Sequence, residues 1–163
     1  KCTRNFYEES VLIRGTKLTA AENGYAQLME KLDTPVASSD KNGNPSLNSN
    51  YGAKELDLFA PGMDIYSSYM GDTYQTGSGA GLSSATVAGV AALIKAYYPN
   101  LTGSQIRDIL LKTVTSRKGV EVEKGIVVNN KQAQDLFLFE DLCLSGGILN
   151  AYQAIMAADK LAK

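Results

Sequence analysis

Apolar and small side chains are densest in residues 82–98, where nearly every face of a helix would be apolar. Pro99 follows directly and cannot continue a helix, so the pattern predicts a helix that ends at Tyr98. Gly89 lies in its middle. Because a helix that is apolar nearly all round is typical of a protein interior, we expect this one to lie inside a domain.

Two shorter helices are predicted after it. The Thr102 hydroxyl can accept from the backbone N–H of Gln105 while the Gln105 side chain reaches back, which makes a capping box. The amphipathic stripe behind it consists of Ile106, Ile109, Leu110 and Val114. Residues 145–147 then turn the chain into a last helix capped by Asn150. Its inward stripe is expected to be Ala151, Ile155, Ala158 and Leu161.

Strand signals lie mostly upstream of these helices. Residues 35–39 and 55–59 predict two strands, and residues 40–45, rich in Asn, Gly and Pro, predict a turn between elements. Residues 64–69 and 72–76, separated by Gly71, predict a hairpin. The alternation of strands and helices indicates an α/β domain, with parallel strands flanked by helices.

Two segments carry weaker patterns. Residues 1–35 offer only a short apolar run at 11–13 and helix-like spacing at 24–32. Residues 116–141 mix charged residues with short apolar runs, and we interpret them as an insertion with one or two strands. At 163 residues, the chain is long enough for one domain spanning 1–163 with a substantial apolar core.

Charge and length exclude several classes of function. The 16 basic and 17 acidic side chains nearly balance and form no long block, so a nucleic-acid role is not expected. No uninterrupted apolar run approaches the roughly 20 residues that cross a bilayer, so no transmembrane segment is expected. The first residues show no apolar signal region. Whether Cys2 and Cys143 pair is left open.

Histidine is absent from the sequence. It is the side chain whose ordinary pKa allows it to take and return a proton near neutral pH. Any Ser-His or Cys-His mechanism is therefore excluded within this polypeptide.

From residue 45 to about residue 158, several phrases occur in an order that resembles the C-terminal half of the subtilisin family of serine proteases. Residues 77–89 read GSGAGLSSATVAG, similar to the nucleophile motif Gly-Thr-Ser-Met-Ala-x-Pro-His-Val-Ala-Gly of that family. Further matches lie at residues 51–62, 99–102 and 146–151. The resemblance implies a subtilisin-like fold with a central buried helix, a protein or peptide substrate, and an extracellular or cell-envelope location.

The same alignment shows where this chain departs from the family. It places Gly79 at the first glycine of the motif, Ala80 at the threonine, Gly81 at the nucleophilic serine and Thr86 at the histidine. Gly79 and Ala80 would border bound substrate, but Gly81 has no side chain to attack it. Ser83 and Ser84 cannot present a hydroxyl at the same point, because each helical step rotates by about 100°. We expect both to cap or solvate the helix start.

The family's aspartate and histidine belong to an upstream half that this chain does not contain. Residues 20–24 are faintly similar to the stretch that supplies an oxyanion-hole asparagine, which makes Asn23 a candidate donor; an ordinary turn is the alternative. Glu55 and Asp57 match a position where some members hold a weak cation, which would be Ca²⁺, because carboxylates two apart on a strand can point the same way. A solvated acidic pair is the alternative. No other cofactor is expected.

Two further patterns have alternative interpretations. Residues 77–81 before a helix would suit a phosphate loop, but the Gly-Lys-Ser/Thr ending is missing. Five tyrosines could form a stacking platform, but with no basic groove beside them we expect core and rim packing. These are Tyr66, Tyr69, Tyr74, Tyr97 and Tyr98.

Three hypotheses of function remain. The chain is a subtilisin-like endopeptidase by family and inactive as it stands. Alternatively, it is a non-catalytic module that binds an extended peptide, or a half that assembles with a missing N-terminal segment supplying the aspartate and histidine.

Overall fold

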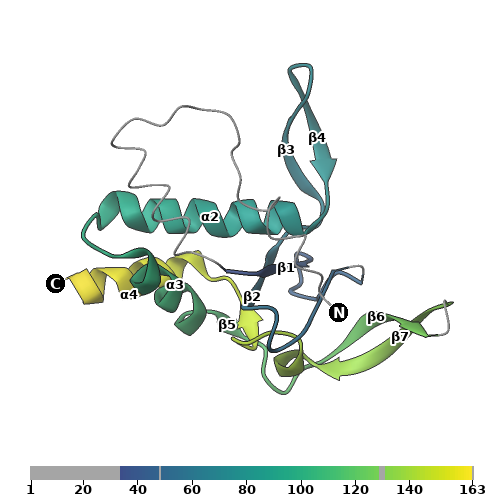
Figure 1. Cartoon of the computed structure of the whole chain (residues 1–163). Helices are drawn as coiled ribbons and strands as arrows, with labels where there is room; N and C mark the ends of the chain where they lie inside the picture. Colours follow the sequence, from purple (N-terminus) through teal and green to yellow (C-terminus); the bar gives the residue numbers. More distant parts are fainter. Residues whose placement is uncertain (1–33, 48, 129–130, 163) are drawn as a thin grey trace.

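The structure is a computed structural model that describes residues 34–47, 49–128 and 131–162 (Figure 1). In the main sheet, β1 pairs with β2 and β2 with β8 in parallel, whereas β5 is antiparallel to β8. The strands are β1 (Val36–Ser39), β2 (Leu58–Pro61), β8 (Gly147–Ile148) and β5 (Thr115–Ser116). Helices flank these strands, so the expected α/β class is confirmed (Figure 1). The second strand begins three residues later than residue 55, where it was expected.

Alternate side chains of β2 enter two separate cores, as strand geometry requires. Leu58 and Ala60 pack among apolar side chains of α2 (Ala80–Tyr97), α3 (Gly103–Lys112) and α4 (Ala151–Ala162). Phe59 points to the opposite face and joins a cluster that also contains Ala37, Leu56, Val122, Phe139, Leu142 and Cys143. The central strand is therefore covered on both faces.

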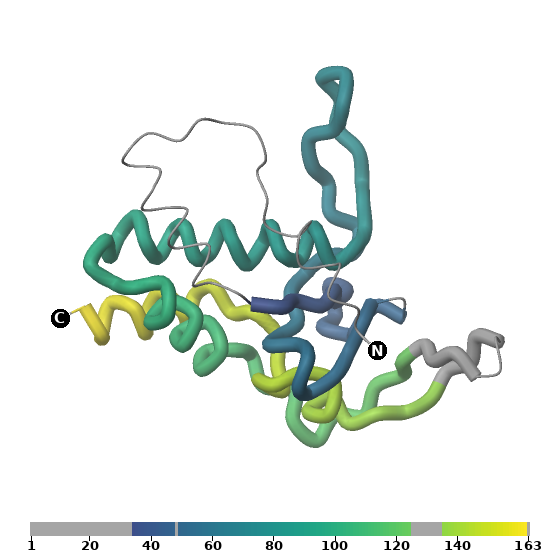
Figure 2. Tube along the Cα trace, in the orientation of Figure 1, coloured from purple at the N-terminus to yellow at the C-terminus, as the bar shows by residue number. Residues whose placement is uncertain are grey.

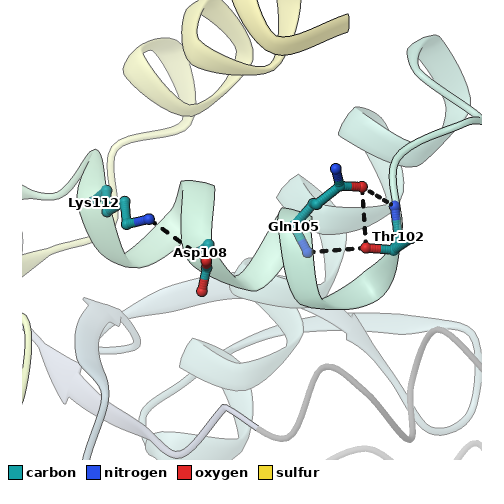
Figure 3. Close-up of polar contacts among 4 residues, drawn as sticks. All are labelled: Thr102, Gln105, Asp108 and Lys112. Carbon is teal, nitrogen blue, oxygen red and sulfur yellow. Dashed lines mark hydrogen bonds and ion pairs between the residues drawn. The ribbon is translucent and has the colours of Figure 1, made fainter.

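The start of α3 follows the predicted capping box (Figure 3). The Thr102 hydroxyl accepts from the Gln105 backbone N–H at 3.2 Å, and the Gln105 side-chain oxygen accepts from the Thr102 backbone N–H at 2.8 Å. Ile106, Ile109 and Leu110 are buried as expected. Lys112 pairs with Asp108 one turn away, at 3.5 Å on the exposed face.

The predicted inward stripe of α4 is only partly right. Asn150 caps the helix, since its side-chain oxygen accepts from the Gln153 N–H at 3.0 Å. Ala154 and Ala158 are buried, whereas Ala151 and Leu161 are exposed. The buried stripe is therefore rotated relative to the expected one, because packing against α3 and α2, rather than the mere presence of apolar residues, selects the face.

α2 was expected to lie inside the domain, and one face of it is buried there. Ser83, Val87, Ala91 and Ile94 are buried along one stripe that packs on β1 and β2. Ala85, Gly89 and Leu93, on other faces, are exposed. By length and composition alone α2 could cross a membrane, a test that core helices of soluble proteins also pass. Its packing on the sheet is that of a core helix, with the opposite side exposed among the described residues.

Two antiparallel ribbons project from the body (Figures 1 and 2). β3 (Ile65–Tyr69) and β4 (Thr73–Gly77) form the predicted hairpin. β6 (Glu121–Val128) and β7 (Lys131–Leu138) form a longer ribbon within residues 116–141, where one or two strands were expected. A short 3-10 helix, η2 (Phe139–Asp141), follows β7.

The base of the β6–β7 ribbon is held by a buried lysine. The Lys124 ammonium donates to the carbonyls of Ser46 at 2.5 Å and Leu47 at 2.8 Å, and lies 5.3 Å from the centre of the Tyr51 ring. Burial lowers the pKa of Lys124 from 10.5 to about 8, because the charged form loses solvation. One side chain thus joins the ribbon to a loop far upstream.

Some expectations fall on residues outside the described ranges. These are the patterns at 11–13 and 24–32, Asn23 and Cys2.

Cys143 is a buried free thiol, 3.7 Å from the Ser145 hydroxyl. The single domain spanning 1–163 and the insertion at 116–141 stay predictions.

Candidate functional site

The site expected from the sequence lies where β4 ends and α2 begins, at residues 79–81, which we call the glycine corner. Gly79 has φ 154° and ψ 163°, a backbone conformation essentially restricted to glycine. Its N–H donates to the Gly62 carbonyl at 2.7 Å, and its carbonyl accepts from the N–H groups of Leu82 at 3.1 Å and Ser83 at 3.3 Å. Gly79 therefore fixes the direction in which the helix leaves the sheet.

Gly81 lies in the first turn of α2 and is exposed, as is Ala80. Apart from its chain neighbours and the backbone of its own helical turn, a Cβ atom built on Gly81 would meet no atom within 4 Å. The first N–H groups of a helix have no intrahelical acceptor, and the helix dipole places partial positive charge beside them. The corner therefore offers open space, N–H donors and a favourable field for negative charge, but no nucleophile.

Hydroxyl groups near the corner bind backbone and do not replace the missing serine. The Ser83 hydroxyl, fully buried, donates to the Ala60 carbonyl at 3.0 Å. Thr86 donates to the Leu82 carbonyl at 3.0 Å and approaches the Pro61 carbonyl at 3.4 Å. Ser78 accepts from the Asp64 N–H at 2.9 Å. The expectation that Ser83 and Ser84 cap or solvate the helix start is wrong, because both are buried and the Ser83 hydroxyl bonds to β2.

The role of Ser83 was missed in the sequence, although a signal was present. Ser83, Val87 and Ala91 are spaced four residues apart, so Ser83 continues the buried stripe of α2. Gly62 makes the close contact with it, since a Cβ atom there would lie 1.9 Å from the Ser83 hydroxyl oxygen and 2.8 Å from the Gly79 carbonyl. The end of β2 and the start of α2 are thus fitted together without room for a methyl group.

Glu55 and Asp57 lie in different environments, one exposed and one buried. Glu55 is exposed in a turn, where its N–H donates to the Gly52 carbonyl at 3.1 Å. Asp57 is buried, and its carboxylate lies 2.6 Å from the half-buried Arg107 guanidinium. They are not neighbours on one strand, which was the premise of the cation site. Across the described ranges, no group of three or more His, Cys, Asp or Glu residues gathers, and the calcium site stays a prediction.

The turn at residues 40–45 has the expected local structure. Asp40 accepts from the N–H groups of Asn42 at 2.8 Å and Asn44 at 2.7 Å, and Gly43 adopts φ 81°. Partial burial alone would raise the pKa of Asp40, but these hydrogen bonds outweigh it and hold the pKa below its ordinary value. The carboxylate organises the turn, as expected from its Asn and Gly content.

Comparison with known proteins assigns the chain to a family. The sequence model of the subtilase family matches residues 22–134, more than half of the chain, and that range contains the glycine corner. The chain therefore belongs to the subtilase family, whose members are serine peptidases.

Curated relatives support the same assignment. Subtilisin DY of Bacillus licheniformis is 43% identical over 81 residues, which are 50% of this chain and 29% of that protein. Subtilisin BL of Lederbergia lenta is 38% identical over 98 residues, 60% of this chain and 36% of that protein. The thermostable alkaline protease of Halalkalibacterium halodurans is 42% identical over 80 residues, 49% of this chain and 22% of that protein. The chain thus spans about a third or less of the length of these relatives.

Solved structures agree on the fold. A protease of Pseudoalteromonas arctica matches 77% of this chain and 35% of its own, with 29% identity and a TM-score of 0.57. The A-subunit of the AB5 toxin from E. coli matches 90% of this chain and 41% of its own, with 21% identity and a TM-score of 0.57. The fold is therefore that of part of a subtilase.

Proposed function

We propose that this chain is a subtilase-family domain that binds extended peptides at the glycine corner and does not hydrolyse them by itself. The observation that carries the proposal is Gly81. It occupies the exposed start of α2, with open space where a side chain would stand. Because the sequence also contains no histidine, neither the attacking oxygen nor the usual base is available in this chain.

Binding is supported by the parts of the corner that remain. Free N–H groups at a helix start suit a peptide carbonyl as well as a developing oxyanion. A protein or peptide ligand follows from membership of a peptidase family. Membership also supports an extracellular or cell-envelope location for the protein, as part of the same proposal.

The test measures binding and cleavage in one sample. A fluorescently labelled extended peptide from casein is titrated with the chain, and its polarisation and intact mass are both recorded. We expect saturable binding with the peptide mass unchanged. Gly81→Leu places a bulky side chain in the open space and should abolish binding without unfolding the chain, whereas Gly81→Ser should retain binding. No binding, or equal binding by the leucine variant, would contradict the proposal.

A second candidate function is that of a complementing half, and the uncovered side of α2 favours it. Leu93 is 42% exposed on a helix that is apolar nearly all round. The matched region covers only 22–36% of the curated relatives described above. In this hypothesis, another segment covers α2 and supplies the aspartate and histidine.

The two candidates differ in the behaviour of the chain alone. A complementing half should expose apolar surface and bind the dye ANS strongly, because an uncovered apolar face attracts it. Leu93→Lys on α2 should then reduce dye binding, with Leu161→Lys on α4 as the matched control. Weak dye binding by a monomer would favour the peptide-binding module.

A further inference from the structure

The β3–β4 hairpin stands clear of the two cores (Figures 1 and 2). Apart from Ile65 and Gly77 at its base, every residue of the two strands is exposed. A lone two-stranded ribbon is marginally stable in water, since neither face is covered. The hairpin therefore presents an unusual amount of uncovered side-chain surface.

Aromatic side chains dominate that surface. Tyr66 lies opposite Thr76 and Tyr74 opposite Ser68, so both tyrosines project from the same face of the ribbon. Their rings stack with centres 5.8 Å apart and planes 25° from parallel. Their exposed fractions are 70% and 62%, and Met70 at the tip is 80% exposed. These tyrosines do not pack in the core or its rim, contrary to the expectation from the sequence.

This composition is typical of protein-binding surfaces. Tyrosine and methionine are enriched in interfaces, where tyrosine supplies rigid contact area at a low cost in side-chain entropy. Serine and threonine beside them supply adaptable hydrogen bonds. The Tyr66–Tyr74 pair is already stacked, so little ordering is needed when a partner binds.

The hairpin carries negative charge, which favours a positively charged partner. Asp64 and Asp72 border β3 and β4, and the sequence contains no lysine or arginine from residue 55 to residue 94. A guanidinium group can stack on an exposed aromatic ring and pair with a carboxylate at the same time. A basic protein segment, rich in arginine, therefore complements this surface.

We propose that the β3–β4 hairpin is a docking element for a basic protein segment, whose arginine side chains lie over the Tyr66–Tyr74 pair and pair with Asp64 and Asp72. The inference is independent of peptide binding at the glycine corner. The two surfaces are nevertheless adjacent, because the Asp64 N–H donates to Ser78, next to Gly79. A partner docked on the hairpin would lie beside the corner.

The experiment uses a defined probe, an extended peptide that alternates arginine and glycine, with an alternating glutamate and glycine peptide as control. Binding to the full chain is measured by calorimetry at low and physiological salt. We expect the arginine peptide alone to bind, more weakly at higher salt because screening reduces the attraction. Hydrogen exchange should show protection at residues 65–77.

Three variants locate the binding surface. Tyr66→Ser with Tyr74→Ser should weaken binding at least about tenfold. Asp64→Asn with Asp72→Asn should remove the salt dependence of binding. The backbone conformation should be kept, because both residues have positive φ (54° and 56°), which asparagine tolerates. Tyr152→Ser, at an equally exposed tyrosine of α4, is the matched control and should change nothing. Equal binding of the acidic peptide, or full binding by the hairpin variants, would overturn the proposal, as would no binding at millimolar peptide.

Discussion

Glycines in this chain differ in what their missing side chains mean. At Gly62 the absence of a Cβ atom is required for packing, since that atom would lie 1.9 Å from the Ser83 hydroxyl oxygen. At Gly81 nothing lies within 4 Å of the same position. The first glycine is a structural necessity, whereas the second leaves an accessible gap in the expected site.

This difference predicts opposite responses to small substitutions. Gly81→Ser should change the free energy of unfolding by less than about 1 kcal/mol, because serine fits the space and has the higher helix propensity. Gly62→Ala should destabilise by roughly 2–4 kcal/mol, because the clash involves the Gly79 backbone as well as Ser83. Urea unfolding of both variants measures the difference. Similar losses for the two would show that the corner is not open.

Lys124 is a residue whose chemistry should appear as a pH dependence. In the unfolded chain it keeps its proton up to its ordinary pKa of 10.5, but in the folded chain the pKa is about 8. Between these values the unfolded state binds more protons, so stability should rise with pH, by roughly 1–3 kcal/mol in total. Below pH 8 this lysine is protonated in both states and contributes no slope.

The comparison of wild type with Lys124→Met isolates the contribution of this lysine from those of all other groups. The unfolding free energy of the wild type minus that of Lys124→Met should rise from pH 8 to pH 10. Lys112→Met, at an exposed lysine of α3, is the control and should leave the slope as in wild type. A Lys124→Met curve parallel to wild type over this range would contradict the buried, deprotonating lysine.

At the scale of elements, α3 begins with hydrogen bonds that can be tested separately (Figure 3). Thr102→Ala removes the acceptor for the Gln105 N–H and should cost about 1 kcal/mol. Ser104→Ala removes another exposed hydroxyl from the same turn and should be neutral or slightly stabilising, because alanine is the better helix former. Thermal unfolding compares the pair. Equal effects would mean that the capping box contributes nothing.

Elements with local causes were predictable from the sequence. The capping box at Thr102, the Asn150 cap and the hairpin around Gly71 each depend on residues close in sequence. Features that depend on residues far apart in the sequence were not predictable in this way. Ser83 is buried because it bonds to Ala60, 23 residues away, and Asp57 is paired with Arg107, 50 residues away.

In two helices the sequence did not show which face is covered. In α4, Ala151 and Leu161 have the same apolar chemistry as Ala158, and only packing against other elements selects among them. In α2, the all-round apolar pattern predicted a helix inside the domain but not which side of it the described residues cover. Periodicity gives the possible faces, while the partners that cover them lie elsewhere in the sequence.

At the scale of the whole molecule, the position of the corner at a helix start was predictable because its motif is contiguous. Gly79, Ala80 and Gly81 lie where the family motif placed them, at the start of the helix behind β4. The predicted oxyanion donor Asn23 lies outside the described residues, and the acidic pair of the cation site does not converge. The corner therefore lies at the predicted helix start, and its role in binding substrate stays a prediction.

We propose that this corner keeps the shape of a subtilase site without its hydrolytic chemistry. The most direct measurement is intact mass after incubation with a fluorophosphonate probe, made on the wild type and on Gly81→Ser. We predict no adduct on either, because neither contains a histidine to activate a serine. A stoichiometric adduct on the wild type would contradict the account, and an adduct confined to Ser83 or Ser84 would identify the residue responsible.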